Sequence, residues 1–286
     1  MLRLTSALAR ILPPPAKRAL YKLGPLTKMI RASLNRAVPA GLTETTVAGG
    51  ILQGARFQLD LHSEKDYWLG TYELDLQAAV RDRVKPGMIA YDVGANIGYI
   101  TVMLARAVGA NGQVFAFEAL PANHARLQTN LSLNHASNAT AIHAAVVGRP
   151  SPVKFLLHAS HGMGKAAGSA GRDENYGDEI EVPGTSLDHF IYTEGHPPPN
   201  VIKLDIEGGE VLALPGMRRT LRDARPLLFL ELHGEQAARL AWEILTETSY
   251  SLHRMTAGYP KITSLAKLDW KAYLVAQPSK SLIPDP

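Results

Sequence analysis

One stretch of thirteen residues, Met88 to Ile100, constrains the fold of this chain more than any other. An apolar run ends at Asp92, a turn with glycines at 94 and 98 follows, and an apolar, helix-compatible run extends from Tyr99 to Val108. This order predicts a strand, a tight loop and a helix start. Backbone N–H groups and the helix dipole at such a place favour a nucleotide-like ligand.

The spacing of the two glycines narrows the ligand class. Gly94 and Gly98 form a G-x-x-x-G pattern, with Asp92 two residues before the first glycine. A dinucleotide-binding loop typically has G-x-G-x-x-G, which allows close approach to a pyrophosphate. The present loop better suits a cofactor without phosphates, whose charged amine can face Asp92. S-adenosylmethionine fits that description.

Length and composition allow one large domain or a domain with an extension. The chain has 286 residues, of which 46% are hydrophobic, so a substantial core can form. It has no cysteine, which excludes disulfides and cysteine-based metal or nucleophile chemistry. No apolar run approaches the length of a membrane span.

Basic charge is concentrated at the N-terminus. Residues 1–43 carry eight Lys or Arg and no acid, whereas the remainder has 22 Lys or Arg against 26 Asp or Glu, a net charge of −4. This distribution weakens the nucleic-acid interpretation that a basic whole-chain charge suggests. The extension has three interpretations: a cap that is solvated or packed on the domain, an attachment to an anionic membrane surface, or an import presequence.

Beyond the extension, the pattern predicts an α/β fold. We divide the chain into a basic extension (1–43), a hairpin and helix cap (44–87) and a cofactor-binding domain (88–286). Strands and helices alternate from residue 88 onward, which implies a parallel sheet covered by helices on both faces. The expected strands of the parallel sheet are 113–117, 139–147, 201–204 and 226–232. The expected helices are 74–84, 121–134, 210–221 and 235–247. Two further strand pairs are expected, 153–157 with 179–182 and 249–255 with 272–276. A polar, Gly-rich loop at 158–178 is expected to act as a lid or binding loop.

Acidic side chains follow several of the expected parallel strands. In such sheets the ligand lies beyond the carboxyl ends of the strands. These ends carry Asp92, Glu118, Ala144 and Ala145, Asp205 with Glu207, and Glu231 with His233. Because like charges repel, this clustering suggests ligands or cations. Glu118 follows Gly94 by 24 residues, near the offset at which an acid meets ribose hydroxyls, although a solvated strand-end acid is the alternative.

Several motifs together resemble the FkbM family of S-adenosylmethionine-dependent methyltransferases. They are Asp92–Gly98, Lys203–Glu210, Glu231–His233, Tyr67–Glu73 and Thr185–Asp188, where Ser186 interrupts a T-L-D element. The likeness covers about residues 45–277. It implies a class I methyltransferase Rossmann-like sheet of seven strands, with the last strand antiparallel.

The resemblance also implies a cofactor site and a reaction. Gly94 to Tyr99 are expected to hold the methionine part, Glu118 the ribose, and Ala145 to lie near adenine. The full set of expected S-adenosylmethionine contacts is Glu73, Asp92, Gly94, Ala95, Asn96, Ile97, Gly98, Tyr99, Glu118, Ala119, Ala145 and Asp205. The implied reaction is O-methylation of a hydroxyl on a sugar, glycolipid or natural product.

His233, Asp205 and Glu207 are the candidate catalytic residues. An alcohol acceptor must lose its proton, and the usual pKa of histidine suits His233 to this role. A strand-end histidine bonded to a carbonyl or to Glu231 is the alternative. Asp205, Glu207 and Glu231 could instead hold a divalent cation, but lysine or arginine side chains could neutralise these acids, and we assign no metal.

Three other functions compete with the methyltransferase interpretation. The first is a nicotinamide-dependent oxidoreductase, which is disfavoured because the sequence has no G-x-G-x-x-G motif. The second is a nucleic-acid methyltransferase, which is disfavoured because the acidic sequence after residue 204 would repel phosphates. The third is a non-catalytic membrane-recruitment module. We expect a small-molecule or saccharide acceptor, a cytoplasmic location, and peripheral membrane contact only through the basic N-terminus.

Overall fold

The computed structural model describes residues 41–158, 164–171 and 176–279. Nearly all of the basic extension therefore lies outside the described residues, and its three interpretations stay predictions. The first strand begins at Leu42, slightly before the expected start of the cap. In the described ranges, no helix combines the length and apolarity that crossing a bilayer requires.

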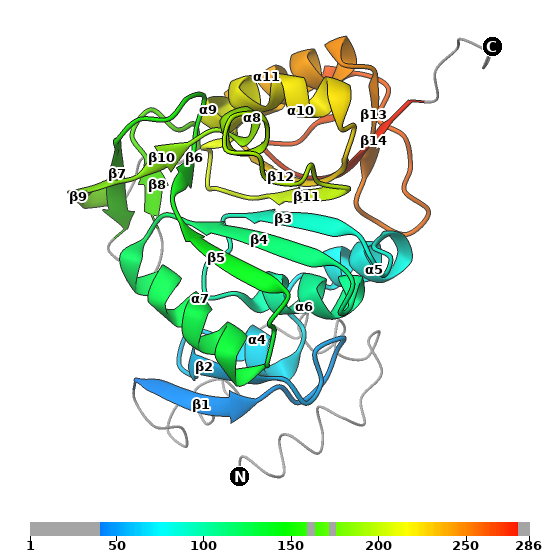
Figure 1. Ribbon diagram of the computed structural model, residues 1–286. Helices are drawn as coiled ribbons and strands as arrows, with labels where there is room; N and C mark the ends of the chain where they lie inside the picture. The colour runs from blue at the N-terminus through cyan, green and yellow to red at the C-terminus, as the bar shows by residue number, and fades with distance from the viewer. Residues whose placement is uncertain (1–40, 159–163, 172–175, 280–286) are drawn as a thin grey trace, which may run out of the picture.

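A seven-stranded mixed sheet forms the centre of the molecule (Figure 1). In spatial order its strands are β13 (Tyr250–Arg254), β14 (Lys271–Pro278), β12 (Leu227–His233), β11 (Val201–Leu204), β3 (Ile89–Val93), β4 (Gln113–Glu118) and β5 (Ala139–His143). The strand β14 runs antiparallel to both of its neighbours, β12 and β13, while β12, β11, β3, β4 and β5 are parallel. The expected sheet with its last strand antiparallel is confirmed.

Helices cover both faces of this sheet (Figure 1). One face carries α5 (Leu74–Arg83), α6 (Tyr99–Val108) and α7 (Pro121–Leu133), and the other carries α8 (Leu187–Tyr192), α9 (Glu210–Ala213), α10 (Arg218–Asp223) and α11 (Glu235–Glu247). Each face has its own buried apolar cluster. In α11 the buried residues Ala237, Ala241, Ile244 and Leu245 recur at helical spacing, so one stripe of the helix packs on the sheet.

The expected helix at 210–221 is interrupted as its proline and glycine predict. A short 3-10 helix, η1 (Leu214–Met217), separates α9 from α10. A second 3-10 helix, η2 (Leu265–Lys267), precedes β14. Proline lacks the N–H that a continuous α-helix needs, which explains the break.

The structure corrects three expectations in the middle of the chain. The strand expected over 139–147 is two strands, because β6 (Ala145–Val146) leaves the central sheet and pairs with β10 (Gly184–Thr185). The expected loop at 158–178 contains β8 (Gly164–Ala166) and the start of β9 (Tyr176–Val182), which flank β7 (Val153–His158) in a three-stranded sheet. The helix α8 was not expected, although Ser186 caps it by accepting the N–H of His189 at 3.2 Å.

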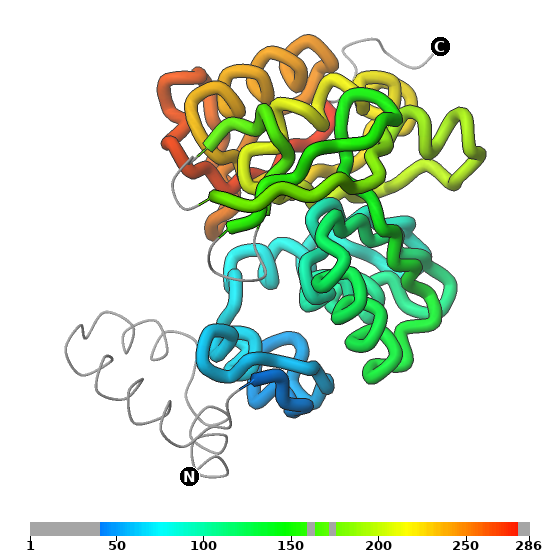
Figure 2. The backbone as a smooth tube through the Cα atoms, turned by 90° about the vertical axis from the view of Figure 1, so that its left-hand side faces the viewer, coloured from blue at the N-terminus to red at the C-terminus, as the bar shows by residue number. Residues whose placement is uncertain are grey.

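The N-terminal cap packs against the domain through α7. It consists of the hairpin β1 (Leu42–Thr46) and β2 (Arg56–Asp60), followed by α4 (Lys65–Leu69), and it occupies the blue end of the tube in Figure 2. Arg126 of α7 donates to Glu64 at 2.6 Å and to the carbonyl of Gln58 at 2.9 Å. Both partners of this ion pair are largely buried, so it holds the cap on α7.

The topology places a crevice between β3 and β11. From β3 the chain adds β4 and β5 on one side of the sheet, and then returns to add β11 and β12 on the other side. The loops that leave β3 and β11 therefore diverge at this point. Open α/β sheets bind ligands outside the carboxyl ends of the strands at such a reversal of order.

Candidate active site

The Gly-rich loop after β3 is held between the ends of β4 and β11. Gly94 has a φ of 79°, and a Cβ placed on it would lie 2.0 Å from the carbonyl oxygen of Asp205. The N–H groups of Gly94 and Ala95 both donate to the carbonyl of Phe117, at 3.0 and 2.9 Å. Only glycine fits this left-handed conformation and this close approach.

We therefore expect Gly94→Ala to lower the free energy of unfolding by about 2–4 kcal/mol. The alanine adds both left-handed backbone strain and an overpacking cost of a few kcal/mol. Gly258→Ala is the matched control, because Gly258 has the same φ of 79° but no atom within 4 Å of an added Cβ. Urea unfolding of the two variants separates the clash from the backbone strain, and equal losses would contradict the packing argument.

A cavity of about 290 Å³ opens over this loop. Most of the residues expected from the sequence line it: Gly94, Ala95, Asn96, Ile97, Tyr99, Glu118, Ala119, Ala145, Asp205 and Glu207. Of the other expected residues, Gly98, Asp92, Glu73 and His233 are not among the described residues that line it. The crevice expected from the topology is thus a real cavity, with carboxylates from β4 and from the segment after β11.

Glu118 closes one side of the cavity and also fixes its walls. One carboxylate oxygen accepts the N–H of Asn96 at 2.8 Å, and the other accepts the N–H of Leu120 at 2.8 Å. Burial raises the pKa of Glu118, although these two backbone hydrogen bonds oppose the effect. An ionised carboxylate has about four lone-pair sites, so Glu118 can still accept hydrogen bonds from a ligand.

Asp92 lies beneath the loop instead of in the cavity. It is fully buried, accepts a hydrogen bond from the Thr101 hydroxyl at 2.6 Å, and lies 3.4 Å from the Lys203 ammonium. The ammonium of Lys203 also donates to the carbonyl of Gly94 at 2.7 Å. In this arrangement Asp92 and Lys203 support the loop from below. The carboxylate of Asp92 does not line the cavity, so the expected contact between Asp92 and a cofactor amine stays a prediction.

The charge on Lys203 is maintained by its acidic neighbours. Burial alone would lower the pKa of Lys203, but Asp92 and Asp205 outweigh it and raise the pKa above its usual value. Lys203 therefore remains an ammonium ion that ties together β3, β11 and the Gly-rich loop. Its position in the lining of the cavity was not anticipated, although it lies inside one of the motifs that the sequence offered.

Three tyrosines form an aromatic wall above the loop. The ring of Tyr67 lies 4.3 Å from that of Tyr72 and 4.9 Å from that of Tyr99, centroid to centroid. All three residues line the cavity. Since Tyr67 lies in α4 and Tyr72 follows it, the N-terminal cap supplies one wall of the cavity.

Other lining residues were not among the expected cofactor contacts. They are Phe117, Leu120, Asn123, Ala144, Val146, Phe155, Gly164 and Ala166. Phe155, Gly164 and Ala166 belong to β7 and β8, whose sheet lies beside the central one (Figure 1). The expectation that the 158–178 segment forms part of a binding site is supported by Gly164 and Ala166, which line the cavity, although β8 itself gave no recognisable sequence signal.

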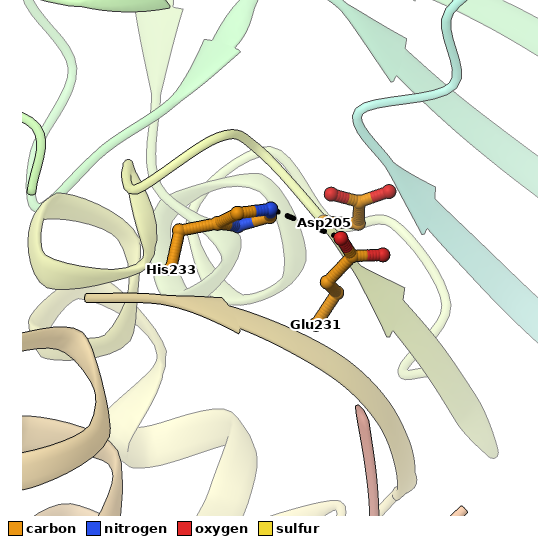
Figure 3. A group of neighbouring side chains, drawn as sticks. All are labelled: Asp205, Glu231 and His233. Atoms are coloured by element: carbon orange, nitrogen blue, oxygen red, sulfur yellow. Dashed lines mark ion pairs between the residues drawn. The ribbon is translucent and has the colours of Figure 1, made fainter. Parts of the chain in front are cut away.

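A second group of side chains lies beside the cavity, at the carboxyl ends of β11 and β12 (Figure 3). His233 Nε2 lies 3.0 Å from Glu231 Oε1 and 3.7 Å from Glu207 Oε2. The ammonium of Lys271, on the neighbouring β14, contacts Glu231 as well. The predicted convergence of acids and histidine at this edge of the sheet is confirmed.

Burial and charge shift the pKa values in this group in opposite directions. Burial raises the pKa of Asp205 to about 8; Lys203 opposes this, and Glu231 adds to it. Burial alone would lower the pKa of His233, but the carboxylates of Glu210 and Glu231 outweigh it and raise the pKa to about 10. An imidazole with this pKa already carries its proton at neutral pH, which weighs against His233 as a general base.

Glu73 lines a separate, much smaller cavity on the far side of Asp205. This space of about 10 Å³ is also bounded by Asp205, Glu231 and Tyr273. Burial raises the pKa of Glu73 to about 7, and the nearby Glu231 adds to this shift. Among the described residues, Asp205 is the only carboxylate that lines both cavities, so it stands at the junction between them.

A comparison with known protein families found a match over this part of the chain. The profile of the methyltransferase FkbM domain matches residues 92–255, more than half of the chain and nearly the whole span from β3 to β13. The chain belongs to the FkbM methyltransferase family. A search of curated protein sequences returned no significant match.

Among solved structures, the chain is similar to several methyltransferases at low sequence identity. The FkbM methyltransferase from Methylobacillus flagellatus KT is 18% identical, with a TM-score of 0.44 over 76% of this chain and 53% of that one. The precorrin-6y C5,15-methyltransferase from Geobacter metallireducens is 18% identical, with a TM-score of 0.43 over 72% and 87%. Aeropyrum pernix fibrillarin, solved with natively bound S-adenosyl-L-methionine, is 11% identical, with a TM-score of 0.41 over 70% and 74%. This FkbM family member therefore spans about half of the M. flagellatus protein.

Proposed function

We propose that this FkbM family member transfers the methyl group of S-adenosylmethionine to a hydroxyl group of a small-molecule or saccharide acceptor. The observation that carries the proposal is the placement of two carboxylates around one cavity. Glu118 is the last residue of β4 and Asp205 follows β11, so they flank the Gly-rich loop from its two sides, and both line the cavity. One carboxylate is available to the cofactor and the other to the acceptor.

In this proposal the cofactor lies along the loop with its ribose at Glu118. The carboxylate can accept both ribose hydroxyl hydrogens, as acids at this offset do in nucleotide-binding sheets. Gly94 to Tyr99 contact the methionine part, while Ala119 and Ala145 lie toward the adenine. The cavity lining is consistent with this orientation because these residues follow one another from β3 across β4 to β6.

In methyl transfer the main task of the protein is to align the acceptor with the methyl group of the cofactor. The acceptor oxygen attacks the methyl carbon, the bond from carbon to sulfur breaks, and its electron pair neutralises the sulfonium to a thioether. The hydroxyl proton passes to a base, for which Asp205 is the best-placed group; with a pKa of about 8 it accepts the proton only once it is ionised, so the rate should rise with pH up to about 8. Since the cofactor supplies its own leaving group, holding oxygen, carbon and sulfur in line and excluding water provides most of the rate gain.

The charge around Asp205 favours a hydroxyl-bearing acceptor over a nucleic acid. Glu118 and Glu207 line the same cavity and would repel phosphates. Carboxylates accept hydrogen bonds from alcohols, so the same residues suit a saccharide or a polyhydroxylated natural product. These features support O-methylation over the nucleic-acid and oxidoreductase alternatives.

Calorimetric titration of the full chain tests the cofactor, with NADH as the comparison ligand. We expect saturable binding of S-adenosylmethionine and none of NADH. Incubation of cell extract with S-adenosylmethionine carrying a labelled methyl group, followed by mass spectrometry, then identifies the acceptor. Label on hydroxyl oxygens of a small molecule or saccharide supports the proposal, whereas absence of cofactor binding, or label on nucleic acid, contradicts it.

A further inference from the structure

Three potential metal ligands converge beside the cavity, within the group shown in Figure 3. One ligand atom each from Asp205, Glu231 and His233 lies within 4.8 Å of the others. The register pairs Leu204 with Leu230, which sets Asp205 beside Glu231 at the ends of adjacent strands. His233 is two residues beyond Glu231 on β12, so both project from the same face of the sheet. The backbone thus presents one imidazole and two carboxylates to the same point.

The surroundings of His233 point to a cation. The residue is only 4% exposed, and Nδ1 lies 3.5 Å from Glu210 Oε1. Nε2 lies 3.0 Å from Glu231 Oε1, and Figure 3 shows the ring pointing toward the two carboxylates. The carboxylates around this buried ring concentrate negative charge, which a metal ion can neutralise in place of the imidazole proton that its binding releases.

The two nearby lysines leave room for a cation. Lys203 is buried and lies 3.8 Å from Asp205, but it is held in place by Asp92 and the Gly-rich loop. The side chain of Lys271 is 42% exposed and contacts Glu231 from the solvent side. A flexible, half-exposed lysine can turn its ammonium into water, which would free the Glu231 carboxylate for a metal.

We propose that Asp205, Glu231 and His233 bind one divalent cation. A set of two carboxylates and one imidazole suits first-row divalent ions such as Mn²⁺, since Mg²⁺ prefers oxygen ligands alone. The cation would lie where Asp205 joins the large cavity to the small one. If the proposed methyl transfer is correct, on which this role rests, a hydroxyl bound to the cation would have a lowered pKa and would give up its proton more easily.

Mn²⁺ binding to the full chain, measured without cofactor by the loss of the electron paramagnetic resonance signal of free Mn²⁺, tests the site directly. We expect saturable binding at one site per chain. Glu231→Gln and His233→Gln are expected to raise the Kd for Mn²⁺ at least tenfold. Lys271→Met is expected to lower this Kd, because it removes the cation that competes for Glu231.

The Lys271 variant distinguishes loss of a metal ligand from misfolding, because a misfolded protein would not bind Mn²⁺ more tightly than the wild type. Lys154→Met is its matched control, because Lys154 forms an exposed ion pair with Glu179 at 3.0 Å, on a different sheet. Absence of saturable Mn²⁺ binding, or equal Kd values for the wild type and all three site variants, overturns the proposal. Cofactor titration in the same samples is a separate measurement, so failure of the metal site and failure of the proposed function remain distinguishable.

Discussion

Replacement of Asp205 by alanine is expected to lower kcat by about 10²–10⁴-fold, the usual range for loss of a positioned acid–base group. Asp205 lines the main cavity and borders the small one, so it can reach an acceptor that sits next to the cofactor. The Kd for S-adenosylmethionine is expected to change less than tenfold, because Glu118 and the Gly-rich loop remain. Steady-state kinetics with the identified acceptor and calorimetry with the cofactor measure the two effects.

A comparison with two further variants separates chemistry from folding. Asp205→Asn keeps the size of the side chain and removes its basicity, so we expect a loss of kcat close to that of alanine. Asp223→Ala, at an exposed acid of α10 paired with Arg219, should leave kcat unchanged. A kcat for Asp205→Asn within threefold of the wild type would rule out Asp205 as the proton acceptor.

Replacement of Glu118 by alanine is expected to weaken binding of S-adenosylmethionine by at least about 100-fold. Hydrogen bonds to a charged group contribute about 1.5–3 kcal/mol each, and the ribose is proposed to donate two. The variant also releases the N–H groups of Asn96 and Leu120, which loosens the cavity wall. Isothermal titration of the wild type and the variant measures the change in Kd.

Glu118→Gln distinguishes the ribose contact from a purely structural role. The amide keeps the size of the side chain but directs its NH₂ group at one of the two backbone donors, so we expect a smaller but clear loss of affinity. Glu247→Ala, at an exposed acid on α11, is the control and should bind the cofactor as the wild type does. If both Glu118 variants bind S-adenosylmethionine as tightly as the wild type does, the ribose does not contact Glu118.

Local sequence patterns predicted most of the fold. The strand, loop and helix at residues 88–108 and the helix at 235–247 agree closely with β3, α6 and α11. These elements are predicted well because apolar runs, glycines and helical spacing are sequence patterns that depend only on neighbouring residues. The strand β8 and the helix α8 were missed. Both are short, and β8 depends on pairing with β7.

The candidate site could be predicted only in part, because burial and direction of side chains depend on distant residues. Glu118 and Asp205 were expected at the cavity and line it. Asp92 and His233 were expected there too, but Asp92 faces Lys203 below the loop, and His233 faces Glu231 beside the cavity. Phe155 reaches the cavity from the small sheet, over a separation that no local pattern records.

The amino-acid sequence by itself determined the order of most strands and helices, the position of the Gly-rich loop and the acids at the ends of the parallel strands. Each of these depends on neighbouring residues or on the rule that parallel strands end at one edge of a sheet. Only the tertiary structure decided which acids face the cavity, which are neutralised by Lys203 or Lys271, and which lie with His233. Those outcomes depend on burial and on charges brought together from β3, β11, β12 and β14, which are far apart in the sequence.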